Sequence, residues 1–259
     1  MNETEKIKAA VKKSYAFLAT SRTIPLEQNC CETSQVPNSD KLPKYGYSQE
    51  EFLNRGYSQE ELKGLPESVT VMADGCGNPT GLGAIREGET VLDLGSGGGI
   101  DVFLASKKVG PHGKVIGLDM TPEMVERAND NARKMNLTNV EFRLGEIEHI
   151  PLADASIDVI MSNCVICLIP DKGSVFREMF RALRRGGRLA IADEIAIRPF
   201  SQEEKIDPDR WCSCLTGAIS ETEYSSTLKQ VGFVGVYVKQ LRPASNPDVF
   251  SAFVSATKP

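Results

Sequence analysis

Apolar residues recur at helical spacing near the start of the chain and gather into short runs further along. Over residues 5–19 they fall three and four positions apart with lysines between them, which predicts an amphipathic helix. The polar stretch 27–43 predicts a loop. The sequence Gly-Tyr-Ser-Gln-Glu-Glu then occurs twice, at 46–51 and 56–61, and each copy carries the Ser-x-x-Glu pattern of a capping box. Two copies are too few for a solenoid, so we expect two short helix starts.

From residue 89 to residue 193, apolar runs of strand length alternate with helix-like segments. The expected strands are 89–95, 114–120, 140–145, 157–163 and 187–193. Helices are expected over 100–109, from the Thr121-Pro122 pair, and over about 171–185, since a cap hydroxyl followed by proline favours a helix start. This alternation predicts an α/β fold with a parallel, doubly wound sheet.

The pattern changes again toward the end of the chain. Residues 201–217 interrupt the alternation, a helix is expected over 222–231, and two final apolar runs predict an antiparallel hairpin. We therefore divide the chain into an N-terminal helical and loop extension, residues 1–70, and an α/β domain, residues 71–259. The segment 198–220 is an insertion before the last helix.

Composition narrows the class of protein. The chain has 259 residues, of which 41% are hydrophobic and 25% charged, as in an ordinary globular protein. It shows no signal-peptide pattern and no apolar run of membrane-spanning length, so a cytoplasmic location is expected. The net charge of −5 argues against nucleic acid as a partner.

A glycine-rich turn follows the first strand. Residues 93–99 have the pattern Asp-x-Gly-x-Gly-x-Gly, which lets the backbone turn sharply and approach a ligand at the start of the next helix. Ile100 stands where the nicotinamide fingerprint needs a small residue. Asp119 ends the second strand, where a carboxylate accepts from ribose hydroxyls. The alternatives are a turn that binds another nucleotide, or no ligand.

Together, these residues resemble the cofactor-binding signature of class I S-adenosylmethionine-dependent methyltransferases. The resemblance implies their Rossmann-like fold with a closing antiparallel hairpin, and S-adenosylmethionine as cofactor. Met120 would pack on the adenine, Ile147 and its neighbour Glu146 would reach the adenine edge, and Asn163 would meet the methionine part. The implied cofactor residues are Asp93, Gly95, Ser96, Gly97, Gly99, Asp119, Met120, Glu146, Ile147 and Asn163.

The seven cysteines are an odd number, so they cannot all form disulfides within the chain. Cys76 lies in Asp-Gly-Cys-Gly-Asn-Pro, just before the first strand of the predicted sheet. Cys164 directly follows the fourth expected strand, and ligands of parallel sheets sit at the carboxyl ends of strands. Cys214 lies in the insertion, which can fold over that edge. A thiol site beside the cofactor is therefore expected.

These cysteine motifs, over residues 68–218, resemble those of the arsenite methyltransferases. The resemblance implies that Cys76, Cys164 and Cys214 bind trivalent arsenic through thiolates. It also implies a disulfide relay with an N-terminal cysteine, for which Cys31 is preferred over Cys30, and reset by thioredoxin or glutathione. Arsenite and methylated arsenicals are the implied substrates and products. Soft trivalent arsenic suits thiolate ligands.

Two departures from the family pattern keep alternatives open. Cys167 stands where the family commonly has asparagine, and Cys212 is an additional neighbour of Cys214. Each could join the relay, compete for arsenic or only pack. A methyltransferase of a small organic acceptor would need none of the thiols. A binding module stabilised by zinc would use Cys164, Cys167, Cys212 and Cys214.

Overall fold

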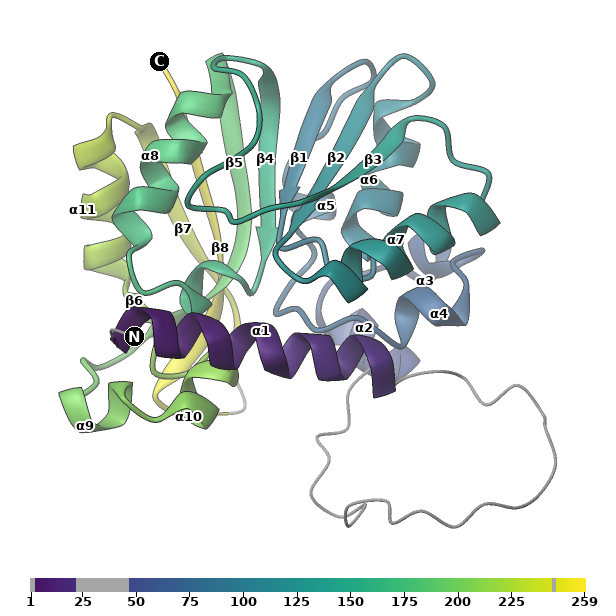
Figure 1. Cartoon of the computed structure of the whole chain (residues 1–259). Coiled ribbons are helices and arrows are strands. Elements are labelled where there is room, and N and C mark those ends of the chain that lie inside the picture. Colours follow the sequence, from purple (N-terminus) through teal and green to yellow (C-terminus); the bar gives the residue numbers. More distant parts are fainter. Residues whose placement is uncertain (1–2, 22–46, 244–245) are drawn as a thin grey trace, which may run out of the picture.

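The computed structural model describes residues 3–21, 47–243 and 246–259. It is one twisted sheet with helices on both faces, and a long N-terminal helix crosses one edge of the sheet (Figure 1). The strands are β1 (Thr90–Leu94), β2 (Lys114–Asp119), β3 (Val140–Leu144), β4 (Ile157–Asn163), β5 (Leu183–Ala196), β6 (Ile219–Ser220), β7 (Val234–Pro243) and β8 (Val249–Thr257).

The strands follow the order β3-β2-β1-β4-β5-β8-β7, with β6 paired to β5. β1 to β5 run parallel, and β8 pairs antiparallel with both β5 and β7. The predicted parallel sheet with a closing hairpin is therefore confirmed. The strand order reverses between β1 and β4, and at such a switch point the carboxyl ends of the strands leave a crevice for ligands.

Longer helices cover both faces of the sheet. These are α6 (Ile100–Val109) and α7 (Pro122–Lys134) on one face, and α8 (Lys172–Ala182) and α11 (Glu221–Val231) on the other. Alternation along β1 shows the two faces: Val91 packs with Phe103 of α6, whereas Leu92 packs in the cluster that holds Phe176 of α8. The central strands are thus buried on both sides, as a parallel sheet requires.

The shorter helices lie in the segments that precede or connect the strands. They are α2 (Gln49–Asn54), α3 (Gln59–Leu62), α4 (Glu67–Thr70), α5 (Pro79–Leu82), the 3₁₀ helix η2 (Ile166–Leu168), α9 (Gln202–Lys205) and α10 (Pro208–Cys212). Both expected capping boxes are present, with Ser48 and Ser58 as caps of α2 and α3. Helix α1 (Glu3–Ser21) extends the predicted helix by two residues at each end and contacts α7 and α10. None of the described helices is long and apolar enough to cross a membrane.

One expected boundary is wrong. The helix predicted to reach about residue 185 ends at Ala182, and the strand predicted from residue 187 begins at Leu183. Lys258 explains the early change, because its ammonium donates to the carbonyls of Phe180 and Leu183. Leu183 also pairs with Ile157 of β4. Tertiary contacts at the end of the chain override the local helical pattern here.

The loop between α4 and α5 is fixed to the sheet by the side-chain amide of Asn163, the last residue of β4. Its oxygen accepts from the backbone N–H groups of Cys76 and Gly77, at 2.9 and 3.2 Å. Its nitrogen donates to the Gly77 carbonyl, the Tyr57 hydroxyl and the Asp101 carboxylate, at 2.8, 3.0 and 2.9 Å. A Cβ at Gly75 would lie 2.5 Å from this amide, so the contact also requires glycine there.

The core predicts a matched pair of stability effects. Leu92→Ala removes a fully buried side chain and should lower the free energy of unfolding by about 2–5 kcal/mol. Leu144→Ala, at a β3 residue that is 55% exposed, should change it by less than about 0.5 kcal/mol. Urea unfolding followed by circular dichroism measures both, and equal losses would contradict the assigned core.

The Asn163 contact predicts a change in thiol accessibility. Cys76 is 2% exposed, so its alkylation requires the loop to open. Asn163→Ala should speed alkylation of Cys76 by roughly tenfold or more, because each lost hydrogen bond contributes about 1 kcal/mol. Peptide mass spectrometry after an iodoacetamide pulse gives the rate. The control Asn129→Ala removes an amide that, among the described residues, bonds within α7, and it should leave the rate unchanged.

Candidate functional site

A cavity opens at the carboxyl edge, where β1 and β4 diverge. Eight of the ten predicted cofactor residues line it: Asp93, Gly95, Ser96, Gly97, Asp119, Met120, Ile147 and Asn163. Gly99 does not line the cavity. It caps α6 with a φ of 96°, and a Cβ there would lie 2.7 Å from the Phe103 ring, so glycine serves the turn itself.

Asp119 organises the glycine turn from the neighbouring strand. Its two carboxylate oxygens accept from the N–H groups of Gly97 and Thr121, each at 2.9 Å. Burial raises the pKa of Asp119, although these hydrogen bonds oppose the effect. The turn also holds the Ser96 hydroxyl, which is buried and has no hydrogen-bond partner in the described part of the chain. The cavity wall therefore offers a carboxylate with spare lone pairs and a free hydroxyl.

Glu146 does not line the cavity, in contrast to its neighbours Ile147 and Glu148. Its carboxylate lies 2.7 Å from the Lys8 ammonium of α1, which also lies 3.0 Å from Glu148. Partial burial lowers the pKa of Lys8, but its bonds to both carboxylates outweigh this, and the net shift is upward. The structure thus uses Glu146 to hold α1 over the edge of the sheet.

Tyrosines from the N-terminal segment complete the cavity. Tyr15 of α1, Tyr47 and Tyr57 all line it. The Tyr57 hydroxyl donates to Asp101 of α6 at 2.9 Å, and burial raises the pKa of Asp101 to about 6. Sequence reasoning did not find these residues, because a tyrosine on the amphipathic helix α1 or just before a short helix carries no local sign of the cavity that it lines.

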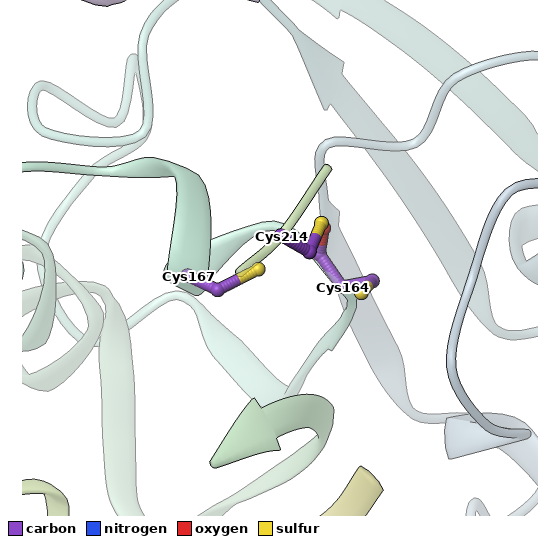
Figure 2. Close-up of side chains that lie close together, drawn as sticks. All are labelled: Cys164, Cys167 and Cys214. Atoms are coloured by element: carbon purple, nitrogen blue, oxygen red, sulfur yellow. The ribbon is translucent and has the colours of Figure 1, made fainter. Parts of the chain in front are cut away.

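A cluster of thiols lies next to this cavity. The Sγ atoms of Cys164, Cys167 and Cys214 all lie within 4.8 Å of one another, and Figure 2 shows the three side chains converging from the residue after β4, from η2 and from the loop after α10. A second group consists of the sulfurs of Cys76 and Cys164 and a carboxylate oxygen of Glu194, and these atoms also lie within 4.8 Å of one another. Cys164 belongs to both groups, and among the described thiols it alone lines the cavity.

The predicted set of Cys76, Cys164 and Cys214 is therefore brought together around Cys164. The three sulfurs do not all lie within 4.8 Å of one another, however. Sequence reasoning left the role of Cys167 open and did not find Glu194. The sequence signal for Cys167 was the Cys-x-x-Cys spacing, which puts it close to Cys164 along the chain, although Cys164 itself precedes the 3₁₀ helix η2. Cys30 and Cys31 lie outside the described residues.

The backbone at two of these thiols is strained. Cys164 and Cys214 have φ values of 60° and 58°, in the left-handed region that residues other than glycine rarely adopt. Such strain persists only where surrounding contacts enforce it. One of those contacts runs directly between the two residues, since the Cys214 thiol lies 3.5 Å from the Cys164 carbonyl.

The thiols are in an apolar environment that favours their neutral form. Burial raises the pKa of Cys76 to about 11, and it also holds the pKa of Cys167 well above its ordinary range. Contacts with Cys164 and Cys167, together with burial, raise the pKa of Cys214. Val11, Leu168 and Trp211 pack against the cluster. The site is thus built to hold several neutral thiols close together.

Comparison with known proteins agrees with the fold. A methyltransferase domain model matches residues 85–232, more than half of the chain. The arsenite methyltransferase of Halobacterium salinarum is 39% identical over 246 residues, which cover 91% of this chain and 59% of that protein. The enzyme of the same name from Aquipseudomonas alcaligenes is 40% identical over 172 residues, covering 64% of this chain and 50% of that protein.

The crystal structure of an arsenic(III) S-adenosylmethionine methyltransferase from Chlamydomonas reinhardtii is also similar. It is 33% identical, with a TM-score of 0.66, and the match covers 77% of this chain and 72% of that one. The chain spans between half and three fifths of the two curated relatives described above. By its domain match and these relatives, the chain belongs to the arsenite methyltransferase family of methyltransferases.

Proposed function

We propose that this protein transfers a methyl group from S-adenosylmethionine to trivalent arsenic. The observation that carries the proposal is the position of Cys164, which lines the cavity of the glycine turn and is shared by both thiol groups. An acceptor bound by this thiol would lie at the edge of the cofactor cavity. The names of the relatives described above support the same reaction.

The cavity fits S-adenosylmethionine as cofactor. The unpartnered Ser96 hydroxyl is free to bond a polar group of the ligand, and Gly97 has open space where a side chain would stand. Asp119 keeps lone pairs for ribose hydroxyls beyond the two N–H groups that it already accepts. Met120 and Ile147 offer apolar surface for the adenine.

S-adenosylmethionine supplies an electrophilic methyl group on a sulfonium. The task of the chain is to hold the arsenic close to that group, so the rate of methyl transfer depends mainly on positioning. Cys164 is the central ligand, with Cys76 and Cys214 as the other thiols predicted from sequence. Arsenic bound by three sulfurs keeps its lone pair as the nucleophile, so no residue has to remove a proton from the acceptor.

A thiol relay follows from the electron balance. Methylation raises arsenic formally from the trivalent to the pentavalent state, and two thiolates that join in a disulfide return two electrons to it. In our proposal Cys31, in preference to Cys30, takes part in this disulfide. Thioredoxin or glutathione then reduces it, as suits a transient disulfide in a reducing compartment.

The two alternative functions make different demands on the thiols. A methyltransferase of an organic acceptor would keep its activity in Cys164→Ser. A zinc module built on four cysteines would need Cys212, which is outside the group of three sulfurs that meet within 4.8 Å in the described chain. Stoichiometric zinc that survives dialysis would favour that module.

Arsenic speciation tests the proposal. The purified protein with S-adenosylmethionine, arsenite and a thiol reductant should produce methylated arsenic, measured by chromatography with mass detection. Cys164→Ser should lower the rate by about 100-fold or more, since it displaces the acceptor from the methyl group. Cys212→Ser, a nearby thiol with no assigned role, is the matched control and should retain most activity. A preparation that binds the cofactor but forms no methylated arsenic would overturn the acceptor assignment.

A further inference from the structure

Cys167 is a thiol that the proposed reaction does not use. It is fully buried, and its sulfur lies within 4.8 Å of those of Cys164 and Cys214. Its backbone N–H donates to the buried Asp193 of β5 at 3.4 Å, which fixes η2 against the sheet. Cys167 is thus a buried and fixed member of the thiol cluster.

The segment that carries Cys214 is locked onto the segment that carries Cys167. The Trp211 indole N–H donates to the Leu168 carbonyl at 2.8 Å. Gly217 lies so close that a Cβ there would stand 2.0 Å from the Cys167 carbonyl oxygen. These contacts, with the left-handed backbone at Cys164 and Cys214, bring sulfurs from two segments, 164–167 and 211–217, within 4.8 Å of one another.

Cys76 lies beside Cys164 but does not belong to this group of three. It shares its own group with Cys164 and Glu194, and its loop is held by Asn163 rather than by the α10 segment. Within the described residues, the one set of three thiols whose sulfurs all lie within 4.8 Å of one another is therefore Cys164, Cys167 and Cys214.

We propose that Cys164, Cys167 and Cys214 form a complete three-sulfur binding site for a trivalent metalloid, so that Cys167 is a ligand and Cys76 is not needed for three-sulfur coordination. The inference rests on the proposed function and refines its ligand set. Arsenious acid, As(OH)₃, exchanges three hydroxides for three thiols and releases three waters. Three As–S bonds replace three As–O bonds, each thiol proton leaves in a water, and no atom changes oxidation state.

The chemistry of the cluster suits this ligand class. The free metalloid, the thiols and the three-sulfur complex are all neutral, so binding buries no net charge among Val11, Leu168 and Trp211. Sulfur is also the donor that soft ions prefer. A carboxylate-containing set such as that of Cys76 and Glu194 suits harder ions better.

X-ray absorption at the arsenic edge tests the inference by counting sulfur neighbours. The full chain with Cys30→Ser and Cys31→Ser serves as background, so that only the other thiols bind, and one equivalent of sodium arsenite is the probe. The background should show three sulfurs, and so should its Cys76→Ser and Cys212→Ser variants. Cys167→Ser should show two sulfurs and one oxygen.

Affinity gives a second readout through Trp211, the only tryptophan of the chain. Its emission should respond to arsenite, and Cys167→Ser should raise the dissociation constant about tenfold or more, in line with the loss of a contact at a metal site. If Cys167→Ser is unstable, Cys167→Ala takes its place, because it adds no buried hydroxyl. The same rise in the dissociation constant is expected.

Three sulfurs in Cys167→Ser together with two in Cys76→Ser would overturn the inference and leave the proposed function intact. A background protein that binds no arsenite would overturn both. A three-sulfur complex that is not methylated when S-adenosylmethionine is added to the unsubstituted chain would support the inference and overturn the proposed function.

Discussion

The side-chain amide of Asn163 is the contact on which the geometry of the site depends. It stands at the end of β4, one residue before Cys164, and bonds the loop of Cys76, the hydroxyl of Tyr57 and the carboxylate of Asp101. One amide thus connects three parts of the chain to the switch point of the sheet: the N-terminal segment, the loop between α4 and α5, and the helix α6. The amide makes five hydrogen bonds, one more than its two donors and two lone pairs ordinarily allow, so one of its donors is shared between two acceptors.

Burial is the second constraint on the site. Asp93 is buried beside the carboxylates of Asp101 and Asp119, and burial raises its pKa well above the ordinary value. The thiols next to the cavity are buried too, and their pKa values are raised. Burial lowers the local dielectric around these groups, which strengthens electrostatic interactions between them and a bound ligand. A neutral acceptor that binds sulfur is compatible with these surroundings.

Much of the fold could be predicted from sequence, because the signals are local. The glycine turn after β1 and the proline that opens α7 each set a backbone conformation directly, and the alternation of strands and helices leaves few topologies. The place of Cys164 beside the cavity follows from the same logic, since it comes directly after a parallel strand.

The rest depended on contacts between distant segments. Lys8 pairs with Glu146 across 138 positions, so the sequence around Glu146 could not show that its carboxylate turns toward α1. The early start of β5 depends on Lys258 at the other end of the chain. The group formed by Cys167 arises because the Trp211 segment folds back onto η2, which no spacing within either segment encodes.

Anomalous diffraction at the arsenic edge, from crystals grown with arsenite and S-adenosylhomocysteine, tests the central claim most directly. The account predicts one strong arsenic peak in contact with the Cys164 sulfur, on the side of the cluster that faces the cofactor sulfur. An arsenic peak confined to other cysteines, with the cofactor in place and Cys164 free of arsenic, would contradict it.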